Sequence, residues 1–586
     1  MSGKLLIISL LIPLLTVLGV SNDNIYGSNR IIMLALVLIA IYPILIILSR
    51  SNISDNIFPI AIYSIGLSLL LHVSLTGSFI NGADMQTEYF MANNVIKTAY
   101  WSQSVTNNVN SMLSIVMMAP MSSILLGLDL VWTFKIIYPI IFALVPVILF
   151  FIYKKTLGDR LSFLTTIIFM FTPFFFLNMP FHARVQIVEL LVVLFIFTVT
   201  YVNNITSSMR FIGIMLLFGI VVSHYGMAYL FLFLMLLSFL IQKLPNKFFG
   251  KFFGTFDSHI KSKIFTIFLA IYIVILISWY LYTSESQPFK TIVIMFDDIG
   301  YSIFNDLLNP YSRDLVNLVS REEFSTIRSI VKWSNAAIIL SIIIGFTNVF
   351  FNQKKFNFDK NFFIFSLGSI VILGASIGIP SFSSKLSFER LYQILLIFLA
   401  PFAIIGLSTI FMMRNSARFE LMISVILSIF LLFNVGFVSE IVHDKFPINI
   451  ALNKSVPTTS YSYYTQNDVV ATQWLNRYGI DDGKYFGSLF QGEFIMQAFM
   501  VKNMFVYNAA TNDTCYDGTN YMLITNKETV YDQIVSIESE KKNEDKKFLS
   551  KTVSFRDSTF NGTLVNTDRI YDTSVSNVNF CNRQIN

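Results

Sequence analysis

Two carboxylates four residues apart, Asp84 and Glu88, are the side chains best suited to chemistry in this chain. They open a polar stretch, residues 76–128, that strongly apolar sequence flanks on both sides. On a helix this spacing puts both carboxylates on one face, and repulsion between them raises the pKa of one. A carboxylate held there can take the proton of a hydroxyl group. The structural alternative is that Asp84 is a helix N-cap and Glu88 a favourable charge in the first turn.

Further polar side chains stand at the ends of apolar runs, where ionisable groups are costly and tend to be functional. These candidates are His72, His182, Arg184, Gln186, Glu189, His224, Tyr225, Arg390 and Tyr392. Charges of both signs at a lipid–water boundary suit a substrate with a phosphate head and a lipid tail. The alternatives are structural: Arg184 can pair with Glu189 or bind lipid phosphate generically, and His224 can hydrogen-bond across helices.

The composition predicts a polytopic membrane protein. Of the 586 residues, 54% are apolar and 13% charged, whereas about one quarter of a soluble protein is charged. About 20 apolar residues cross a bilayer, so the apolar runs predict an α-helical protein with about thirteen transmembrane helices. These runs lie near 5–20, 31–49, 58–75, 132–152, 161–179, 187–203, 210–223, 226–242, 264–283, 334–352, 362–380, 391–413 and 419–440. The net charge of +6 is small for this length and says little about nucleic acid, but no basic block or nucleic-acid-binding motif appears, so we expect no nucleic acid partner.

The basic residues of the short loops predict the orientation. They cluster near 154–160, 243–263, 354–360 and 414–418, and these loops all face the cytoplasm if the N-terminus does. The loops 76–131 and 284–333 and everything after 441 are then extracytoplasmic. Within the first of these, residues 112–128 are apolar but interrupted by Pro120, which favours an interfacial or re-entrant helix.

The composition becomes polar after residue 440. We expect two units, a transmembrane catalytic domain over 1–440 and a small extracytoplasmic α/β domain over 441–586. Residues 467–478 read as a helix capped by Asp468 and ended by Gly479. Both cysteines of the chain, Cys515 and Cys581, lie in this polar region, which suggests a disulfide there.

Four short motifs carry a family resemblance: 82–89 (GADMQTEY), 112–120 (MLSIVMMAP), 183–190 (ARVQIVEL) and 223–226 (SHYG). Together with the loop order, they resemble an archaeal polytopic membrane family within the GT-C class of glycosyltransferases. The similarity covers roughly residues 55–440 and extends only loosely into the C-terminal part.

The resemblance implies transfer of a sugar from a polyprenyl (dolichyl) phosphate carrier to an acceptor hydroxyl at the outer face of the cell membrane, with inversion. Asp84 matches the position of the base, with Glu88 as the substitute, and Arg184, His224 and Arg390 match the residues that hold the donor phosphate. The acceptor is a glycan, glycolipid or protein.

Two alternatives to this function stay open. An oligosaccharyltransferase-like transfer of a whole glycan is disfavoured because the chain has no Trp-Trp-Asp-Tyr-Gly motif and no acidic pair in the 180–186 loop. We therefore expect no required cofactor, although a divalent metal is compatible with the class. A transporter or lipid flippase would need polar groups at mid-membrane, and the middle of each apolar run is almost purely aliphatic and aromatic.

Overall fold

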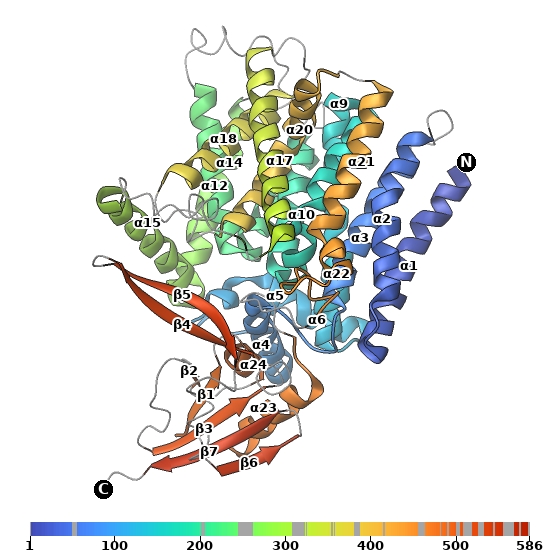
Figure 1. The fold of residues 1–586 in the computed structure, drawn as a ribbon. Coiled ribbons are helices and arrows are strands. Elements are labelled where there is room, and N and C mark those ends of the chain that lie inside the picture. Colours follow the sequence, from blue (N-terminus) through green and yellow to red (C-terminus); the bar gives the residue numbers. More distant parts are fainter. Residues whose placement is uncertain are drawn as a thin grey trace.

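The computed structural model is a bundle of long helices with a smaller, sheet-containing C-terminal region packed below it (Figure 1). It describes residues 2–49, 56–200, 206–243, 262–306, 323, 325–352, 356, 358–379, 387–413, 416–454, 463–480, 482–488, 491–499, 504–507, 518–525, 533–542, 545–554, 568–573 and 576–583.

Eleven helices of the described chain are long and apolar enough to cross a membrane. They are α1 (Ser2–Tyr26), α2 (Arg30–Leu48), α3 (Ile57–Ser74), the stretch Leu130–Phe171, α10 (Ala183–Thr200), α12 (Tyr225–Lys243), α14 (Ser262–Tyr282), α17 (Thr326–Phe351), α18 (Lys360–Gly378), α20 (Phe388–Ile410) and α21 (Ala417–Asn434). The expected α-helical, multi-pass membrane fold is confirmed.

The stretch Leu130–Phe171 joins α7 (Leu130–Trp132), a π-helical turn (Thr133–Ile137), α8 (Tyr138–Phe142) and α9 (Leu144–Phe171). Gly158 interrupts α9 with φ 75° and ψ 176°, a backbone that favours glycine, and Lys154 pairs with Asp159 across the break at 2.6 Å. Counting this stretch as two crossings and adding the shorter α11 (Ser207–Ser223) gives the thirteen that the sequence predicts. The number thirteen stays a prediction.

The polar stretch after α3 folds into short helices. These are α4 (Ala83–Thr98), the 3-10 helix Asn108–Ser111, α5 (Leu113–Val116) and α6 (Met118–Leu126). The side chains of Ile124 and Leu125 on α6 are 69% and 79% exposed. A helix this short with a bare apolar surface agrees with the expected interfacial segment, whose place in a membrane stays a prediction.

The segment after α14 contains α15 (Gln287–Asp306), which runs obliquely along the outside of the bundle (Figure 1). The expected outer loop 284–333 is shorter at its C-terminal end, because α17 already begins at Thr326, where Ser325 caps it. Residues 307–322 lie outside the described part of the chain.

The C-terminal region contains α22 (Phe437–Ile441), α23 (Gln466–Tyr478), α24 (Gln491–Phe499) and a five-stranded sheet in the order β2-β1-β3-β7-β6. The strands are β1 (Lys484–Ser488), β2 (Met504–Tyr507), β3 (Gly518–Ile524), β6 (Asp568–Asp572) and β7 (Asn577–Arg583), and β4 (Gln533–Lys542) pairs with β5 (Asp545–Ser554) in a separate hairpin. Strand β1 is parallel to β2 and β3, whereas β7 is antiparallel to β3 and β6.

Helix α23 corrects one expectation. Its N-cap is Thr465, and Asp468 is the third residue of the helix. The two form a capping box, in which each side chain accepts from the other's backbone N–H. Asp468 is therefore the partner of the cap. Gly479 follows the helix as expected. Cys515 and the side chain of Cys581 lie outside the described residues, so the suggested disulfide stays a prediction.

The C-terminal region packs directly on α4 through α24 (Figure 1). Thr87 Oγ1 donates to Gln497 Oε1 at 3.4 Å, and the ring of Tyr89 lies 5.7 Å from that of Phe499. The helix that carries Asp84 and Glu88 is thus held between the bundle and the C-terminal region.

Candidate active site

Asp84 lies in the first turn of α4 and binds two arginines through one oxygen. Its Oδ2 accepts hydrogen bonds from Arg184 Nη2 at 2.6 Å and from Arg390 Nη2 at 2.9 Å. Helix α4 begins after Gly82 without a side-chain cap bond, so Asp84 is not its N-cap. The contact joins segments that are 100 and 306 residues apart in the sequence.

Four helix N-termini meet at this point. Asp84, Arg184 and Arg390 stand in the first turns of α4, α10 and α20, and His224 directly precedes α12. The N-terminus of a helix carries a partial positive charge and unpaired N–H groups, which favour bound anions. The site is therefore positive in two ways, through the guanidinium groups and through the helix ends.

Glu88, one turn after Asp84 on α4, has the opposite environment. Its side chain is fully buried, whereas that of Asp84 is 33% exposed. Glu88 Oε1 lies 3.3 Å from Arg184 Nη1, but no hydrogen bond reaches either oxygen from the described residues. Burial raises the pKa of Glu88 to about 8 despite the opposing charge of Arg184. Glu88 is consequently mostly protonated at neutral pH.

Asp84 stays ionised. Burial alone would raise the pKa of Asp84, but the guanidinium charges of Arg184 and Arg390, joined by His182 where it is protonated at low pH, outweigh burial and hold this pKa below its usual range. No described residue bonds Oδ1, because both arginine bonds go to Oδ2. Asp84 therefore keeps one carboxylate oxygen without a hydrogen bond from the described residues.

His182 is neutral and fixes Arg390. Its Nδ1–H donates to the carbonyl of Asn178 at 2.7 Å, and its Nε2 accepts from Arg390 Nη2 at 2.8 Å. Burial and then the charge of Arg390 lower the pKa of His182 to about 4, which agrees with the acceptor role of Nε2. The Nη2 atom of Arg390 therefore bridges His182 and Asp84.

His224 presents a hydrogen-bond donor. Its Nδ1 accepts from the backbone N–H of Met227 at 3.1 Å, so Nε2 carries the proton in the neutral ring. That Nε2–H is buried and has no partner among the residues that the structure describes. Burial, followed by the charges of Arg184 and Arg390, lowers the pKa of His224 well below its usual value.

A cavity of about 250 Å³ lies between α12, α15 and α20 next to this cluster. His224, Tyr225 and Arg390 line it together with apolar side chains that include Leu230, Phe233, Phe296 and Ile394. It is mostly apolar, with its cationic and donor groups contributed by α20 and the start of α12. Arg184 does not line it.

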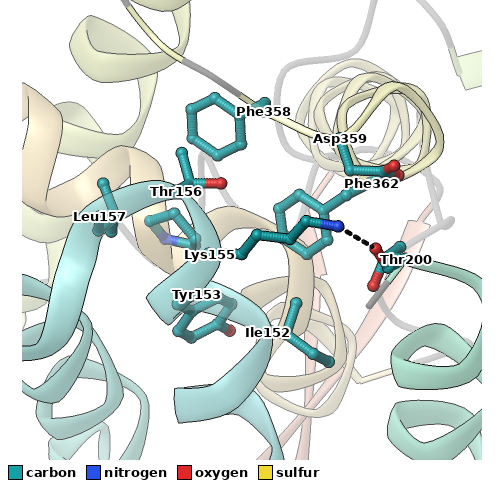
Figure 2. Close-up of a pocket in the computed structure, with 10 residues that line it drawn as sticks. Ile152, Tyr153, Lys155, Thr156, Leu157, Thr200, Phe358, Asp359 and Phe362 are labelled. Carbon is teal, nitrogen blue, oxygen red and sulfur yellow. Dashed lines mark hydrogen bonds between the residues drawn. The ribbon is translucent and has the colours of Figure 1, made fainter. Parts of the chain in front are cut away.

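A second pocket at the opposite end of the bundle is far smaller, about 10 Å³ (Figure 2). Figure 2 shows Lys155 directed at the carbonyl of Thr200, to which its Nζ donates at 3.1 Å. Of these two cavities, the larger lies at the Asp84 end of the bundle.

The remaining candidates lie apart from the arginine cluster or have structural contacts. His72 donates to the carbonyl of Leu69 and accepts from Asn449 Nδ2 at 3.0 Å, which ties α3 to the segment after α22. Gln186 donates to the carbonyl of Met179 at 2.7 Å. Tyr392 is buried and stacks on Phe388, with ring centroids 6.1 Å apart.

Glu189 on α10 is buried, and neither of its carboxyl oxygens has a partner in the described chain. The ion pair with Arg184, which was the structural alternative to a role in the site, is not formed, because Arg184 binds Asp84 and approaches Glu88. We assign no role to Glu189.

Sequence reasoning missed Lys135. Its Nζ, almost fully buried, donates to the carbonyls of Thr76 at 2.9 Å, Gly77 at 2.7 Å and Phe79 at 2.7 Å. These bonds fix the chain between α3 and α4 and hence the start of the helix that carries Asp84. A lone lysine inside an apolar run was the available signal, since ionisable residues in such runs rarely lack a partner.

Gly82, at the end of that connection, has φ 89°, and a Cβ there would lie 2.6 Å from the Cβ of Phe181. Only glycine fits this close approach. Among the described residues, no group of three or more His, Cys, Asp and Glu side chains is placed to hold a metal ion.

A family model described as "Predicted membrane protein (DUF2206)" matches residues 209–578, more than half of the chain. The chain belongs to this family. The region of the DUF2206 match contains His224 and Arg390, whereas Asp84 and Arg184 precede it. No protein of curated function matches the sequence.

Two solved structures are distantly similar to this DUF2206 member. Against the archaeal oligosaccharyltransferase AglB from Archaeoglobus fulgidus, in complex with an inhibitory peptide and a dolichol-phosphate, the identity is 9% and the TM-score 0.48. The match covers 77% of this chain and 64% of AglB, so the chain spans less than two thirds of that protein. Against ArnT from Cupriavidus metallidurans, bound to undecaprenyl phosphate, the identity is 7%, the TM-score 0.35, and the coverage 90% and 97%. Similarities at this level assign no activity.

Proposed function

We propose that the chain transfers a sugar from a polyprenyl-phosphate carrier to an acceptor hydroxyl at the outer membrane face, with inversion at the anomeric carbon. The observation that carries the proposal is one cluster: an ionised carboxylate, two arginines and four helix N-termini beside an apolar cavity. The GT-C resemblance of the motifs around Asp84, Arg184 and His224 supports the same reaction.

The donor phosphate binds between Arg390 and His224. Both line the cavity, and each has a buried N–H without a partner in the described chain, Nε in Arg390 and Nε2 in His224. Charged donors to phosphate oxygens make strong hydrogen bonds, and the apolar wall of the cavity suits the isoprenoid chain. Of the three phosphate candidates, Arg184 is the least suited, because it faces the two carboxylates and does not line the cavity.

In the proposed step the acceptor oxygen attacks the anomeric carbon on the face opposite the phosphate. The new C–O bond forms as the bond from the anomeric carbon to the phosphate oxygen breaks, and the electron pair stays on the phosphate. Arg390, His224 and the helix N-termini stabilise that charge, so the step includes no metal. The hydroxyl proton passes to Asp84 Oδ1. Because the arginines make Asp84 a weak base, it accepts the proton late, when the new bond has largely formed.

Mass spectrometry of cell-surface glycans, with and without the gene, tests the proposal. Loss of one sugar, together with a rise in the polyprenyl-phosphate form of that sugar, is expected. Restoring the wild-type gene should reverse both changes, and restoring the Asp84→Asn form should reverse neither. Unchanged glycans and an unchanged carrier pool contradict the proposal, and trapping of the lipid at the inner face would instead indicate a flippase.

A further inference from the structure

Arg390 has two neighbours, and a phosphate held by two bonds would have to displace one of them. One Nη2 atom reaches both Asp84 Oδ2 at 2.9 Å and His182 Nε2 at 2.8 Å, so both hydrogens of that nitrogen are engaged. A guanidinium group offers two edges for two-pronged binding, Nε with Nη2 and Nη1 with Nη2. Both edges need an Nη2 hydrogen. A phosphate held by two parallel bonds therefore cannot bind Arg390 while Asp84 and His182 keep theirs.

Asp84 is the partner that can give way. Its side chain is one-third exposed, and Arg184 also binds its Oδ2, at 2.6 Å, so Asp84 would keep one guanidinium partner without Arg390. His182 is more buried and is anchored through Nδ1 to the carbonyl of Asn178. The other titratable carboxyl group near Asp84, Glu88, approaches Arg184 rather than Arg390.

We propose that the donor phosphate and Asp84 compete for Arg390, so that donor binding itself releases the base. This inference rests on the proposed function, because it takes the polyprenyl phosphate as the competing anion. Withdrawing one of two guanidinium groups makes the carboxylate more basic once the leaving phosphate is in place. The protein then holds a weak, arginine-bound carboxylate before the donor arrives and a stronger base afterwards, which orders donor before acceptor.

The competition can be measured from the side of the phosphate. By thermodynamic linkage, Asp84 weakens the binding of phosphate to Arg390 as much as phosphate weakens the bond between Asp84 and Arg390. The probe is dolichyl phosphate without a sugar, and the readout is its Kd for the purified full-length protein. Asp84→Asn should bind the probe more tightly than the wild type, on the order of tenfold to a hundredfold, although its sugar transfer is much slower.

Asp129→Asn is the matched control for removal of a negative charge. Asp129 caps α7 by accepting from the N–H of Val131 at 2.8 Å, a bond that asparagine can replace, and it contacts neither arginine. The affinity of Asp129→Asn for dolichyl phosphate should equal that of the wild type. A double-mutant cycle with Arg390→Gln then separates competition from simple repulsion: the gain from Asp84→Asn should largely vanish in the Arg390→Gln background.

The outcomes are distinct. If the wild type binds dolichyl phosphate and Asp84→Asn binds it no more tightly, the competition is wrong and the proposed donor stands. A gain that persists without Arg390 is repulsion between charges and overturns the proposal as well. If neither the wild type nor Asp84→Asn binds the probe, although the two proteins have the same unfolding temperature, the proposed donor is wrong. The proposed competition is then wrong as well.

Discussion

Asp84 and Glu88 are one helical turn apart on α4, yet their surroundings keep Asp84 ionised and Glu88 mostly protonated at neutral pH. Asp84 is partly exposed and bound by two guanidinium groups, whereas Glu88 is sealed and has no hydrogen bond from the described chain. Paired carboxylates with pKa values pushed apart are a common arrangement in sites that move protons. The ionised member, Asp84, is also the one whose side chain is partly exposed.

Asp84→Asn should lower sugar transfer by roughly 10²–10⁴, the usual contribution of a general base. The fold should survive, because Asp84 is not the cap of α4 and asparagine can still accept from Arg184. Transfer rates and thermal unfolding of Asp84→Asn and Glu88→Gln, measured side by side, check this. A stable Asp84→Asn protein with normal turnover would move the role of base to Glu88.

Glu88 predicts a pH dependence of stability. The folded protein keeps the proton of Glu88 up to about pH 8, whereas an unfolded chain loses it near 4.5. Stability from this group is therefore fully present below the unfolded pKa and is lost as pH rises through the folded pKa, at up to about 1.4 kcal/mol per pH unit.

The thermal unfolding temperature between pH 6.5 and 8.5 should accordingly fall with pH in the wild type and fall less in Glu88→Gln. The lowered pKa of His182 acts in the opposite direction, but only below about pH 6.5, so this window separates the two. Parallel curves for both proteins would show that Glu88 is already ionised in the folded state.

The two arginines predict different losses. Arg390→Lys keeps the charge but loses the fork, so it should weaken dolichyl phosphate binding by roughly tenfold. Arg184→Lys should leave that binding nearly unchanged, because Arg184 does not line the cavity. It should lower the transfer rate, because Arg184 positions Asp84. Equal losses of binding in both variants would return Arg184 to the phosphate site.

The sequence predicted the members of the cluster but not their bonds. Asp84, Glu88, His182, Arg184 and Arg390 were recognisable because ionisable residues are rare at the ends of apolar runs. Which of them pair depends on how helices 100 to 306 residues apart meet. Local spacing allowed a pair that does not form, Arg184 with Glu189, since the sequence of one helix does not show which side chains the neighbouring helix places beside it.

At the scale of elements, the apolar runs predicted the long helices, whereas the conformations of the short polar connections could not be predicted. The connection between α3 and α4 follows from Lys135, whose three acceptors lie 56 to 59 residues away. Gly82 completes it, because the positive φ turns the chain past Phe181 into α4. No periodicity signals such a contact.

Gly82→Ala should displace the start of α4 and reduce transfer strongly. Gly127→Ala is its control, because Gly127 also has a positive φ, 62°, but open space around its Cα. Gly127→Ala carries the strain of a left-handed alanine, about 1–2 kcal/mol. Gly82 has a different backbone, with φ 89° and ψ 152°, which is essentially restricted to glycine, and Gly82→Ala adds the clash with Phe181. Unfolding temperatures and transfer rates of the two should differ, and equal behaviour would show that Phe181 moves aside freely.

At the scale of the molecule, the fold class was predictable because composition alone demands a bilayer. The orientation rests on the basic loops, and the structure adds that the cluster and the C-terminal region lie at the same end of the bundle (Figure 1). If that end faces outward, the N-terminus is inside.

Single cysteines at Ser104 and Asn352, in a protein from which Cys515 and Cys581 have been removed, test this orientation. Both positions are exposed. An impermeant thiol reagent on intact cells should label Ser104→Cys and spare Asn352→Cys, and broken cells should label both. The reverse pattern would invert the topology and place the site at the cytoplasmic face.

The contact between Thr87 and Gln497 has a consequence for biosynthesis, because 410 residues separate the two. At a translation rate of about 5–20 residues per second, the ribosome delivers Gln497 roughly 20–80 s after Thr87. During that interval Asp84 can meet Arg184 first and Arg390 only much later. A nascent chain therefore holds Asp84 with one arginine while the 206 residues from Arg184 to Arg390 are made. A premature stop after α21 leaves the cluster without the C-terminal region that packs against α4, so such truncated products should be early substrates of membrane quality control.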